Sequence, residues 1–378
     1  MRKDWEYKKL GEVCETSSGG TPSKTYTEYY ENGTIPWLRS GEVSQGYIYD
    51  AEIYISELGL NKSSAKIFPK GTVLIAMYGA TVGEVGILCN PMCTNQAICG
   101  VLPNDLYNSE FLRYVLLSHK DKYLSLAIGG AQPNISQQII KNTLIPLIDK
   151  STQLSIVAEL DKINELIQLK KQQLKDYDQL AQSIFYEMFG DPVENEKGWE
   201  VKKLGEVTIY PNERISIEDI QSNQYIGVEN LLKNKAGVSF SNQLPNATSA
   251  IYFSFNDILL GNIRPYLKKI WLSDTIGGAS GDVIVIRISS NKVLPMYLFK
   301  LLSTDTFFDY DNLNTKGAKM PRGDKKVIAK FPVPLPPLPL QQQFAARIEA
   351  IERQKQQVSE TIKDLETLLA SRMQYWFD

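Results

Sequence analysis

Histidine is nearly absent from this chain, which has a single one, His119, among 378 residues. Cysteine is scarce too, and Cys14, Cys89, Cys93 and Cys99 do not stand at the Cys-x-x-Cys spacing of structural zinc sites. We expect reduced, half-buried thiols among apolar strand residues, with zinc binding as the alternative. No catalytic Ser-His-Asp or Cys-His constellation can be assembled, so the sequence predicts no catalytic residue and no metal ligand.

Long apolar runs are also missing. None approaches the length that crosses a bilayer, and the segment 1–6 lacks the apolar core of a signal peptide. We therefore expect a cytoplasmic protein that does not associate with a membrane.

Nucleotide-binding motifs are absent as well. The sequence has neither the Gly-x-x-x-x-Gly-Lys-Ser/Thr phosphate loop nor Gly-x-Gly-x-x-Gly after a strand. It also lacks the Asn/Asp-Pro-Pro-aromatic motif of amino-methyltransferases. We expect this chain to bind no cofactor of its own.

Excess positive charge is the last absence, since 41 basic residues face 43 acidic ones and the net charge is −2. A protein that coats DNA nonspecifically is usually strongly basic. If this chain binds DNA, it must do so through local basic clusters or with the help of other subunits.

What the sequence does contain is an internal repeat. The segment Trp5–Val13 recurs as Trp199–Val207, 194 residues later, with eight of nine positions identical. Looser similarity follows, as between 130–132 (Gly-Ala-Gln) and 317–319 (Gly-Ala-Lys). Repeats of this quality indicate two copies of one structural unit.

Each copy ends in a long amphipathic segment in which apolar residues alternate at spacings of four and three. Such a 3.5-residue period predicts a coiled-coil seam. The seam is interrupted by Lys170 in the first segment and by Lys355 and Arg372 in the second. The predicted seam residues are Ile156, Leu160, Ile163, Ile167, Leu174, Tyr177, Ala181, Ile184 and Met188, and Phe344, Ile348, Ile351, Val358, Ile362, Leu365, Leu369 and Trp376.

Helix start and stop signals bound these segments. Ser151-Thr152 precedes the first, Pro339 opens the second, and Gly190-Asp191-Pro192 ends the first. We expect the two helices to pair, and an antiparallel pair would give the chain pseudo-two-fold symmetry. The alternative is that each helix packs only on its own globular domain.

The globular parts have both strand and helix signals. Strands are predicted at 72–77, 85–88, 258–260 and 283–288, and helices at 109–119 and 296–303. The expected fold class is α+β, with bent β-sheets in two globular domains separated by two long antiparallel coiled-coil helices. The predicted boundaries are 1–150 and 191–338 for the globular domains, and 151–190 and 339–378 for the helices.

Several loops combine glycine, small polar groups and isolated cations. Glycine permits close backbone approach, Arg, Asn and Gln match base edges, and Lys holds phosphates. The loop 316–326, with five cations, is the strongest case. The candidate DNA-binding residues are Ser18, Gly20, Thr21, Lys24, Arg39, Ser40, Tyr78, Thr81, Asn95, Gln96, Gln132, Asn134 and Ser136 in the first copy, and Arg214, Asn262, Arg264, Tyr266, Lys268, Lys269, Ser280, Lys316, Lys319, Arg322 and Lys325 in the second.

Two alternatives stay open. Glu200-Val201-Lys202, with Asp191 upstream, resembles part of a metal-dependent nuclease signature, although Glu-x-Lys is common by chance and both copies have it where a domain begins. The chain could also be a coiled-coil scaffold with two protein-binding domains.

Taken together, the motifs resemble the specificity subunits of type I restriction–modification systems. The resemblance rests on Trp-x-x-x-Lys-Leu-Gly-Glu at the start of each copy, on 35–41, on 130–136, and on a proline–Gln-Gln lead into a long helix that ends in an aromatic-rich turn. It covers the whole chain. The first copy departs from it, with Ile145–Asp149 where a Pro-Pro-Leu lead is usual and Thr152-Gln153 where the family has Glu-Gln.

The resemblance implies a non-catalytic subunit. Each globular domain would be a target recognition domain that binds one half of an asymmetric, bipartite site in double-stranded DNA. The paired helices would set the unread spacer and dock two methyltransferase subunits that methylate adenine, and restriction subunits would join the complex. These partners would supply the chemistry of S-adenosylmethionine, ATP and Mg²⁺.

Overall fold

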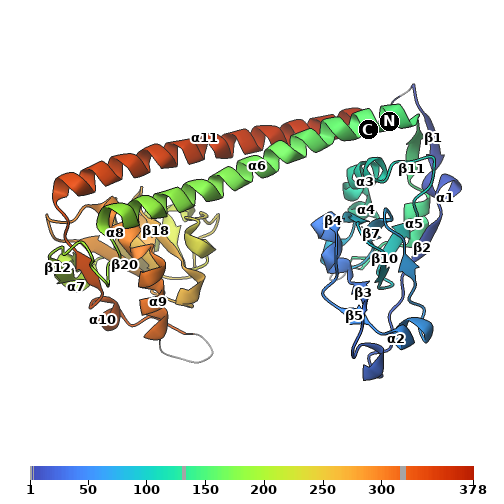
Figure 1. Ribbon diagram of the computed structural model, residues 1–378. Helices are drawn as coiled ribbons and strands as arrows, with labels where there is room; N and C mark the ends of the chain where they lie inside the picture. Colours follow the sequence, from blue (N-terminus) through green and yellow to red (C-terminus); the bar gives the residue numbers. More distant parts are fainter. Residues whose placement is uncertain (1, 3, 130–132, 316–320) are drawn as a thin grey trace. The chain divides into compact units, whose positions relative to one another are not determined.

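The computed structural model describes residue 2 and residues 4–129, 133–315 and 321–378. The chain divides into two compact units (Figure 1). The first consists of residues 1–170 and 361–378, and the second of residues 171–360. Each unit therefore contains one globular body together with part of each long helix. No helix in the described ranges is both long and apolar enough to span a membrane.

The first unit has mixed helices and strands. A larger sheet has the order β2-β10-β7-β8-β4, a second has the order β5-β3-β9-β6, and β1 pairs with β11. The strands are β1 Glu6–Lys9, β2 Thr16–Ser18, β3 Ile35–Leu38, β4 Tyr47–Ile48, β5 Tyr54–Ile55, β6 Ile67–Phe68, β7 Val73–Ala76, β8 Val85–Leu88, β9 Met92–Thr94, β10 Ile98–Val101 and β11 Leu144–Leu147. The helices are α1 Leu10–Val13, α2 Glu57–Asn61, α3 Ser109–Ser118, α4 Lys120–Leu126, α5 Gln137–Lys141 and α6 Lys150–Phe189.

The second unit repeats this plan. Its two larger sheets have the strand orders β13-β20-β17-β18 and β14-β16-β19-β15, and β12 pairs with β21 as β1 does with β11. The strands are β12 Val201–Lys203, β13 Thr208–Ile209, β14 Arg214–Ser216, β15 Tyr225–Ile226, β16 Ser249–Phe253, β17 Ile258–Gly261, β18 Ile270–Leu272, β19 Gly277–Ala279, β20 Val283–Ile288 and β21 Pro332–Pro334. The helices are α7 Leu204–Val207, α8 Pro295–Leu302, α9 Asp305–Leu313, α10 Lys325–Ile328 and α11 Leu338–Phe377.

The predicted α+β class and the internal repeat are confirmed. β7 and β17 are central in their sheets and buried throughout, as expected of short continuous apolar runs. The repeated opening motif forms β1–α1 and β12–α7. The N–H of Leu10 donates to the carbonyl of Thr143, and that of Leu204 donates to the carbonyl of Phe331. The motif thus ties the start of each globular body to the segment that leads into its long helix.

The long helices pair with each other within each unit. In the second unit Asp178 Oδ1 accepts from Lys355 Nζ at 2.6 Å, and Arg347 approaches the sulfur of Met188, so the two helices run antiparallel there. In the first unit the guanidinium of Arg372 contacts the carboxylate of Glu159. Lys355 and Arg372, which interrupt the predicted seam, therefore join the helices through ion pairs.

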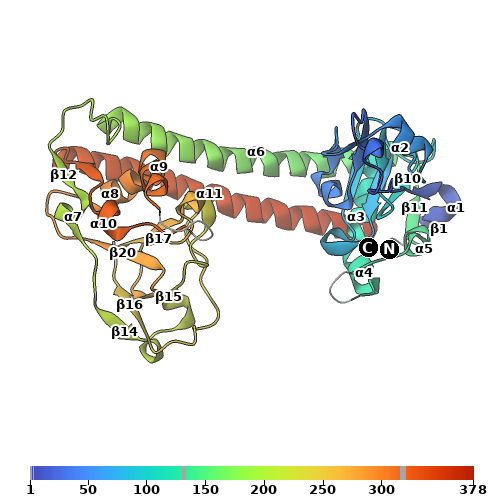
Figure 2. The same cartoon turned by 90° about the horizontal axis from the view of Figure 1, so that it is seen from below.

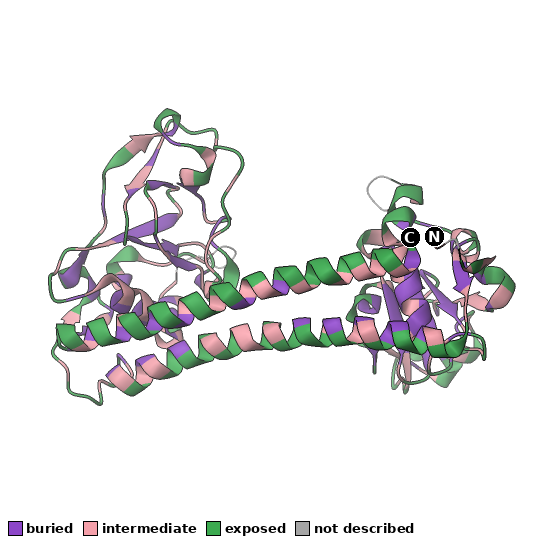
Figure 3. Ribbon diagram, turned by 90° about the horizontal axis from the view of Figure 1, so that it is seen from above, coloured by how far each residue is buried: buried purple, intermediate pink, exposed green. Residues whose placement is uncertain are grey.

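Most of the predicted seam is buried, as Figure 3 shows for α6 and α11. However, Leu174, Tyr177, Ile184, Met188, Leu365, Leu369 and Trp376 are only half-buried. Three aromatic residues outside the predicted pattern, Phe185, Phe189 and Phe377, are buried instead. The seam prediction is incomplete there because the helix ends pack on the globular cores as well as on each other. Phe377 joins the core of the first unit, and Phe185 and Phe189 join that of the second.

The predicted start of the first long helix is corrected by one residue. α6 begins at Lys150, and the cap is Asp149 rather than Ser151 or Thr152. Oδ1 of Asp149 accepts from the backbone N–H of Thr152 at 2.9 Å, and Oδ2 accepts from its hydroxyl. A hydrogen bond from the hydroxyl of Ser151, together with these two from Thr152, holds the pKa of Asp149 well below its usual range. The predicted stop is confirmed, since Gly190 follows α6 with a φ of 76°.

Candidate nucleic-acid interface

In the first unit, five segments that contain candidate residues lie next to one another: 18–24, 37–40, 77–81, 94–97 and 133–136. Backbone hydrogen bonds connect them in series. The bonds run from Gly20 N to Thr94 O (2.9 Å), from Asn95 N to Leu38 O (2.9 Å), from Met77 N to Ala97 O (2.8 Å), from Ile135 N to Met77 O (2.9 Å) and from Gly79 N to Pro133 O (2.9 Å). The fold thus gathers segments more than 100 residues apart into one loop surface, hereafter the first loop surface.

Exposed polar side chains lie on this surface. Tyr78 and Asn134 are exposed and share a β-bridge. Gln96 is exposed and accepts a hydrogen bond from the hydroxyl of Thr21. Lys24 is also exposed, in the turn that follows. The structure therefore brings these candidate residues together at an accessible surface.

The remaining candidates of the first unit differ in accessibility. Ser136 is exposed and caps α5 by accepting from the N–H of Ile139, and Ser18 donates to Gln137 Oε1 at 3.4 Å. Arg39 is exposed, with its guanidinium at the carboxylates of Glu42 and Glu52. Ser40, Thr81 and Asn95 are half-buried.

Gly20 is a correction. It is buried, and a Cβ at this position would lie 2.3–2.4 Å from Ser64 and from the backbone N of Ala65. Its carbonyl accepts from the indole N–H of Trp37 at 2.9 Å. The close backbone approach that glycine permits here is made by the protein itself rather than by a ligand.

In the second unit the equivalent loops meet in the same way, forming a second loop surface from 261–268, 278–282 and 321–325. Asn262 N donates to Asp282 O (2.9 Å), as Met77 does to Ala97. Gly323 N donates to Asn262 O (3.1 Å), as Ile135 does to Met77. Ile263 and Arg322 share a bridge, as Tyr78 and Asn134 do. The repeat therefore extends from the frame into the loops, whereas the side chains differ.

The cations of the second loop surface fall into two groups. Arg264, in a left-handed conformation with φ of 53°, and Tyr266 are exposed. The exposed Arg322 pairs with Asp282 at 3.1 Å. Lys268 is half-buried and binds Asp305 at 2.8 Å. Because Lys268 forms this ion pair within the protein, the pair competes with the predicted contact between Lys268 and DNA.

Lys269 is the other cation that is bound by a group of the protein itself. Its Nζ donates to the carbonyl of Val228 at 2.6 Å, and burial lowers the pKa of its ammonium. Lys325, by contrast, is exposed over the ring of Tyr210, and Ser280 is half-buried beside the start of β20.

Arg214 stands apart from this group. It lies on β14, where its guanidinium donates to the hydroxyl and the carbonyl of Ser249. Figure 2 shows the sheet that contains β14 and β16 farther from the long helices than β17 and β20 are. Three further candidates, Gln132, Lys316 and Lys319, lie outside the described residues.

A polar residue missed at the sequence level is Asp282. It belongs to the Gly-Ala-Ser-Gly-Asp loop singled out for its glycines, but only the fold shows that its carboxylate holds Arg322. The signal available in the sequence was an acidic residue, Asp282, in one candidate loop and a cluster of cations in another.

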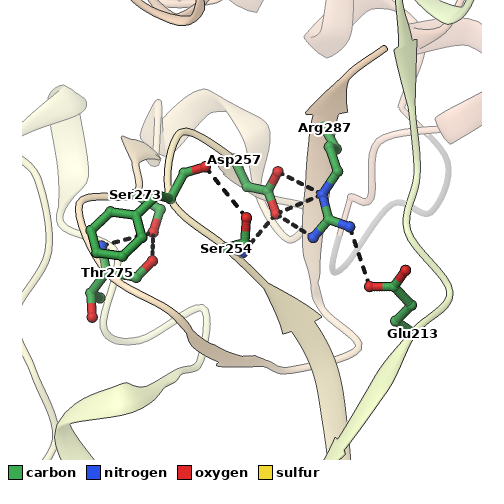
Figure 4. A network of polar contacts seen from close by, with 7 residues as sticks. Glu213, Ser254, Asp257, Ser273, Thr275 and Arg287 are labelled. Atoms are coloured by element: carbon green, nitrogen blue, oxygen red, sulfur yellow. Dashed lines mark hydrogen bonds and ion pairs between the residues drawn. The ribbon is translucent and has the colours of Figure 1, made fainter.

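An ion pair between the half-buried Arg287 and the buried Asp257 supports the strands below the second loop surface. Arg287 on β20 makes three hydrogen bonds to the carboxylate of Asp257, 2.8–3.2 Å long, and one to Glu213 (Figure 4). Asp257 is 2% exposed and also accepts from the N–H of Ser254. Hydrogen bonding to Asp257 raises the pKa of Arg287. The pair joins the start of β17 to β20, the two strands that lead to and from the loops.

The nuclease alternative finds no support at its residues. Glu200 Oε1 lies 4.0 Å from Lys202 Nζ, and its other oxygen lies 3.4 Å from Lys292. Asp191 caps the turn after α6 and accepts from Thr306. Among the described residues, no three His, Cys, Asp or Glu side chains are grouped so that they could hold a metal ion.

The cysteines are free thiols, as expected. Burial raises the pKa of Cys93 to about 11 and that of Cys99 to about 12, so both stay protonated at neutral pH.

Comparison with known proteins gives the family. A model of the type I restriction modification DNA specificity domain matches residues 2–176 and 196–367. The MjaIX specificity subunit of Methanocaldococcus jannaschii is 33% identical over 54% of this chain and 52% of that protein. The EcoDI specificity subunit of Escherichia coli is 22% identical over 92% of this chain and 81% of that protein. The chain spans about half the length of the MjaIX subunit, and 41% of the EcoR124I/EcoR124II subunit of E. coli.

Solved structures show the same fold. The S subunit of a type I restriction–modification system from M. genitalium has a TM-score of 0.53 at 14% identity, covering 99% of this chain and 96% of that one. A chain from a study of assembly and conformational transition of the type I R-M system has a TM-score of 0.63 at 18% identity, covering 100% and 98%. Since the family model matches both copies of the repeat and most of the sequence, the chain belongs to the family of type I restriction modification DNA specificity domains.

Proposed function

We propose that this chain is the DNA sequence-recognition subunit of a type I restriction–modification complex. Each globular domain binds one half of an asymmetric bipartite site through its loop surface. The observation that carries the proposal is the matched pair of loop surfaces, which share backbone hydrogen bonds and bridges but not side chains. Equivalent frames with unlike side chains suit the recognition of two different half-sites.

The paired helices α6 and α11 set the unread spacer and dock two methyltransferase subunits, and restriction subunits join the assembly. The chain itself is non-catalytic. S-adenosylmethionine, ATP and Mg²⁺ belong to the partners, which carry out adenine methylation and cleavage. With a net charge of −2, the chain relies on these partners for part of its hold on the duplex.

A gel-shift experiment on the complex with its methyltransferase subunits tests the proposal. Methylome sequencing of cells that carry the system first identifies the bipartite site. The complex should then bind a duplex with that site more tightly than one with either half scrambled, and salt should weaken all binding. Equal affinity for all three duplexes would contradict it. The chain alone, given Mg²⁺ and S-adenosylmethionine, should neither cleave nor methylate DNA.

A further inference from the structure

Two buried oxygens in the second unit have no hydrogen-bond partner among the residues that the structure describes: Oδ1 of Asn262 and Oδ1 of Asp311. Asn262 lies in the second loop surface, directly after β17. Asp311 lies on α9, is 2% exposed, and has a pKa raised to about 6 by burial. Buried polar atoms without partners are rare in folded proteins, so each of these requires an explanation.

The two oxygens converge on the same point. A Cβ added to Gly323 would lie 2.8 Å from Oδ1 of Asp311 and 3.0 Å from Oδ1 of Asn262. The two oxygens therefore lie no farther apart than the sum of these two distances. A side chain at position 323 would crowd both oxygens, and glycine avoids this. The backbone N–H of Gly323 donates to the carbonyl of Asn262, which joins the loop 321–325 to the end of β17.

Other charged groups nearby are already engaged. Arg322 pairs with Asp282 at 3.1 Å, and the ammonium of Lys325 lies over the ring of Tyr210. Tyr210 is the titratable group whose pKa is affected by Asp311, and its hydroxyl donates to the carbonyl of Lys325. Burial raises the pKa of Asp311, and none of the cations that the structure describes forms an ion pair with its carboxylate. The carboxyl group of Asp311 can then be satisfied in two ways, by a hydrogen bond with the amide of Asn262 or by binding a proton from solvent.

We propose that Asp311 is a positioning residue for Asn262 and sets which end of its amide the second loop surface presents to DNA. When Asp311 is ionised, its carboxylate accepts from the amide nitrogen of Asn262, and the amide oxygen turns outward as an acceptor. When Asp311 is protonated, its hydroxyl donates to Oδ1 of Asn262, and the NH₂ group turns outward as a donor. Of these two residues only Asn262 contacts DNA, and Asp311 acts through it.

The chemistry of base edges then follows from the orientation of Asn262. An outward oxygen accepts from the amino group of adenine or cytosine, and an outward NH₂ donates to N7 or O6 of guanine or to O4 of thymine. At neutral pH Asp311 is mainly ionised, so Asn262 presents its oxygen. This inference rests on the proposed function and extends it to a named determinant of specificity.

The first unit lacks this arrangement. Met77 occupies the place of Asn262 in the backbone pattern, and Ile135 occupies that of Gly323. Both residues are buried in the apolar core of their unit. The first half-site should therefore show none of the pH dependence expected of the second, and serves as a control within the same complex.

Side-chain amide NMR tests the contact without DNA. In the full chain with ¹⁵N-labelled asparagine, the resonance lost in Asn262→Ser identifies Asn262. It should titrate with a midpoint near pH 6 in the parent chain and in Asp309→Asn, which removes an exposed acid from the same helix. In Asp311→Asn it should not titrate, because the introduced amide donates to Oδ1 at every pH. An unchanged titration in Asp311→Asn, or no titration in the parent, would overturn the inference.

Binding to DNA tests the consequence. The complex with its methyltransferase subunits is titrated with duplexes substituted at each position of the second half-site, at pH 5.5 and 7.5 and constant ionic strength. Base preference at one position should change roughly tenfold with pH, and Asp311→Asn should show the pH 5.5 preference at both values. A preference that is the same at both pH values overturns the inference. Absence of any sequence preference, with the NMR titration intact, overturns the proposed function and leaves the Asp311–Asn262 contact standing.

Discussion

Gln153 and Gln341 make the same three hydrogen bonds in the two halves of the chain. Both are fully buried in the first turn of a long helix. Each accepts from a backbone N–H at the start of the helix that follows the larger sheet, and donates to two backbone carbonyls. The partners, all at 2.8–2.9 Å, are Asn108, Leu106 and Ile148 for Gln153, and Leu294, Lys292 and Pro336 for Gln341.

These glutamines should be required for attaching the helices to the globular bodies. Gln153→Leu and Gln341→Leu each leave a buried N–H and two carbonyls without partners, which we expect to cost about 2–4 kcal/mol. Urea denaturation of the full chain measures the loss. Gln342→Leu, at an exposed position, is the control, and a loss no larger than that of the control would refute the role.

Breaking the ion pair below the second loop surface should destabilise the second unit. Arg287→Met leaves the carboxylate of Asp257 buried without its cation, and we expect a loss of about 3–5 kcal/mol at neutral pH. Removing both partners in Arg287→Met/Asp257→Leu should recover part of the loss, since no charge is then left buried. Thermal unfolding of the parent, of Arg287→Met, of Asp257→Leu and of the double variant gives the coupling between the two residues. If the losses of the two single variants add up to the loss of the double variant, the two residues are not coupled.

The equivalent residues Asn134 and Arg322 should act on different half-sites. Both take part in the bridge beside their loop surface. Asn134→Ala should weaken binding through the first half-site, and Arg322→Ala through the second, each by about 1–3 kcal/mol. Competition between duplexes with one half-site scrambled distinguishes the two effects. Equal losses at both half-sites for either variant would contradict the assignment of one domain to each half.

The length of the paired helices should set the spacer. Inserting one heptad in each helix, after Lys170 and after Glu360, preserves the seam and lengthens each helix by about 10 Å. The unread spacer should then grow by about three base pairs, at about 3.4 Å each. Methylome sequencing reads both the half-sites and the spacer. The same spacer with altered half-sites would rule out a ruler function.

Burial of Asp311 should make the chain less stable above its pKa. The pKa of this acid is raised to about 6 in the folded chain, so its protonated form is favoured by folding. Stability is greatest below the pKa of the unfolded acid, about 4, falls as pH rises through the folded pKa of about 6, and then levels off. Asp311→Asn should therefore gain up to about 3 kcal/mol over the parent at pH 8, with little difference near pH 4. Asp309→Asn should show no such gain, and a gain independent of pH would point to another cause.

Much of the architecture could be predicted from local patterns. Identity between Trp5–Val13 and Trp199–Val207 predicts the repeat, because the same sequence forms the same strand and short helix. Continuous apolar runs predict β7 and β17, and the 3.5-residue period predicts the helix seam. The seam prediction fails at Phe185, Phe189 and Phe377, since a heptad pattern describes helix pairing and not the packing of helix ends on a globular core.

The candidate DNA-binding residues depended more on the fold. The sequence indicated glycine-rich polar loops in both copies, and most of those described lie in two loop surfaces. It could not show that Gly20 packs against its own chain, that Lys269 binds a backbone carbonyl, or that Asn262 and Asp311 both approach Gly323. Those outcomes join residues far apart in sequence, and no local pattern records which side chain fills the space beside another.

By itself, then, the sequence determined the duplicated plan, the two long helices and the lack of a recognisable catalytic motif, because these depend on short-range identity and periodicity. Tertiary structure alone decided which loops meet, which cations stay accessible and, in the part of the chain that the structure describes, which carboxyl oxygen is buried without a hydrogen-bond partner. The physical reason is that exposure, ion pairing and the pKa of a buried acid depend on neighbours that only the folded chain brings together.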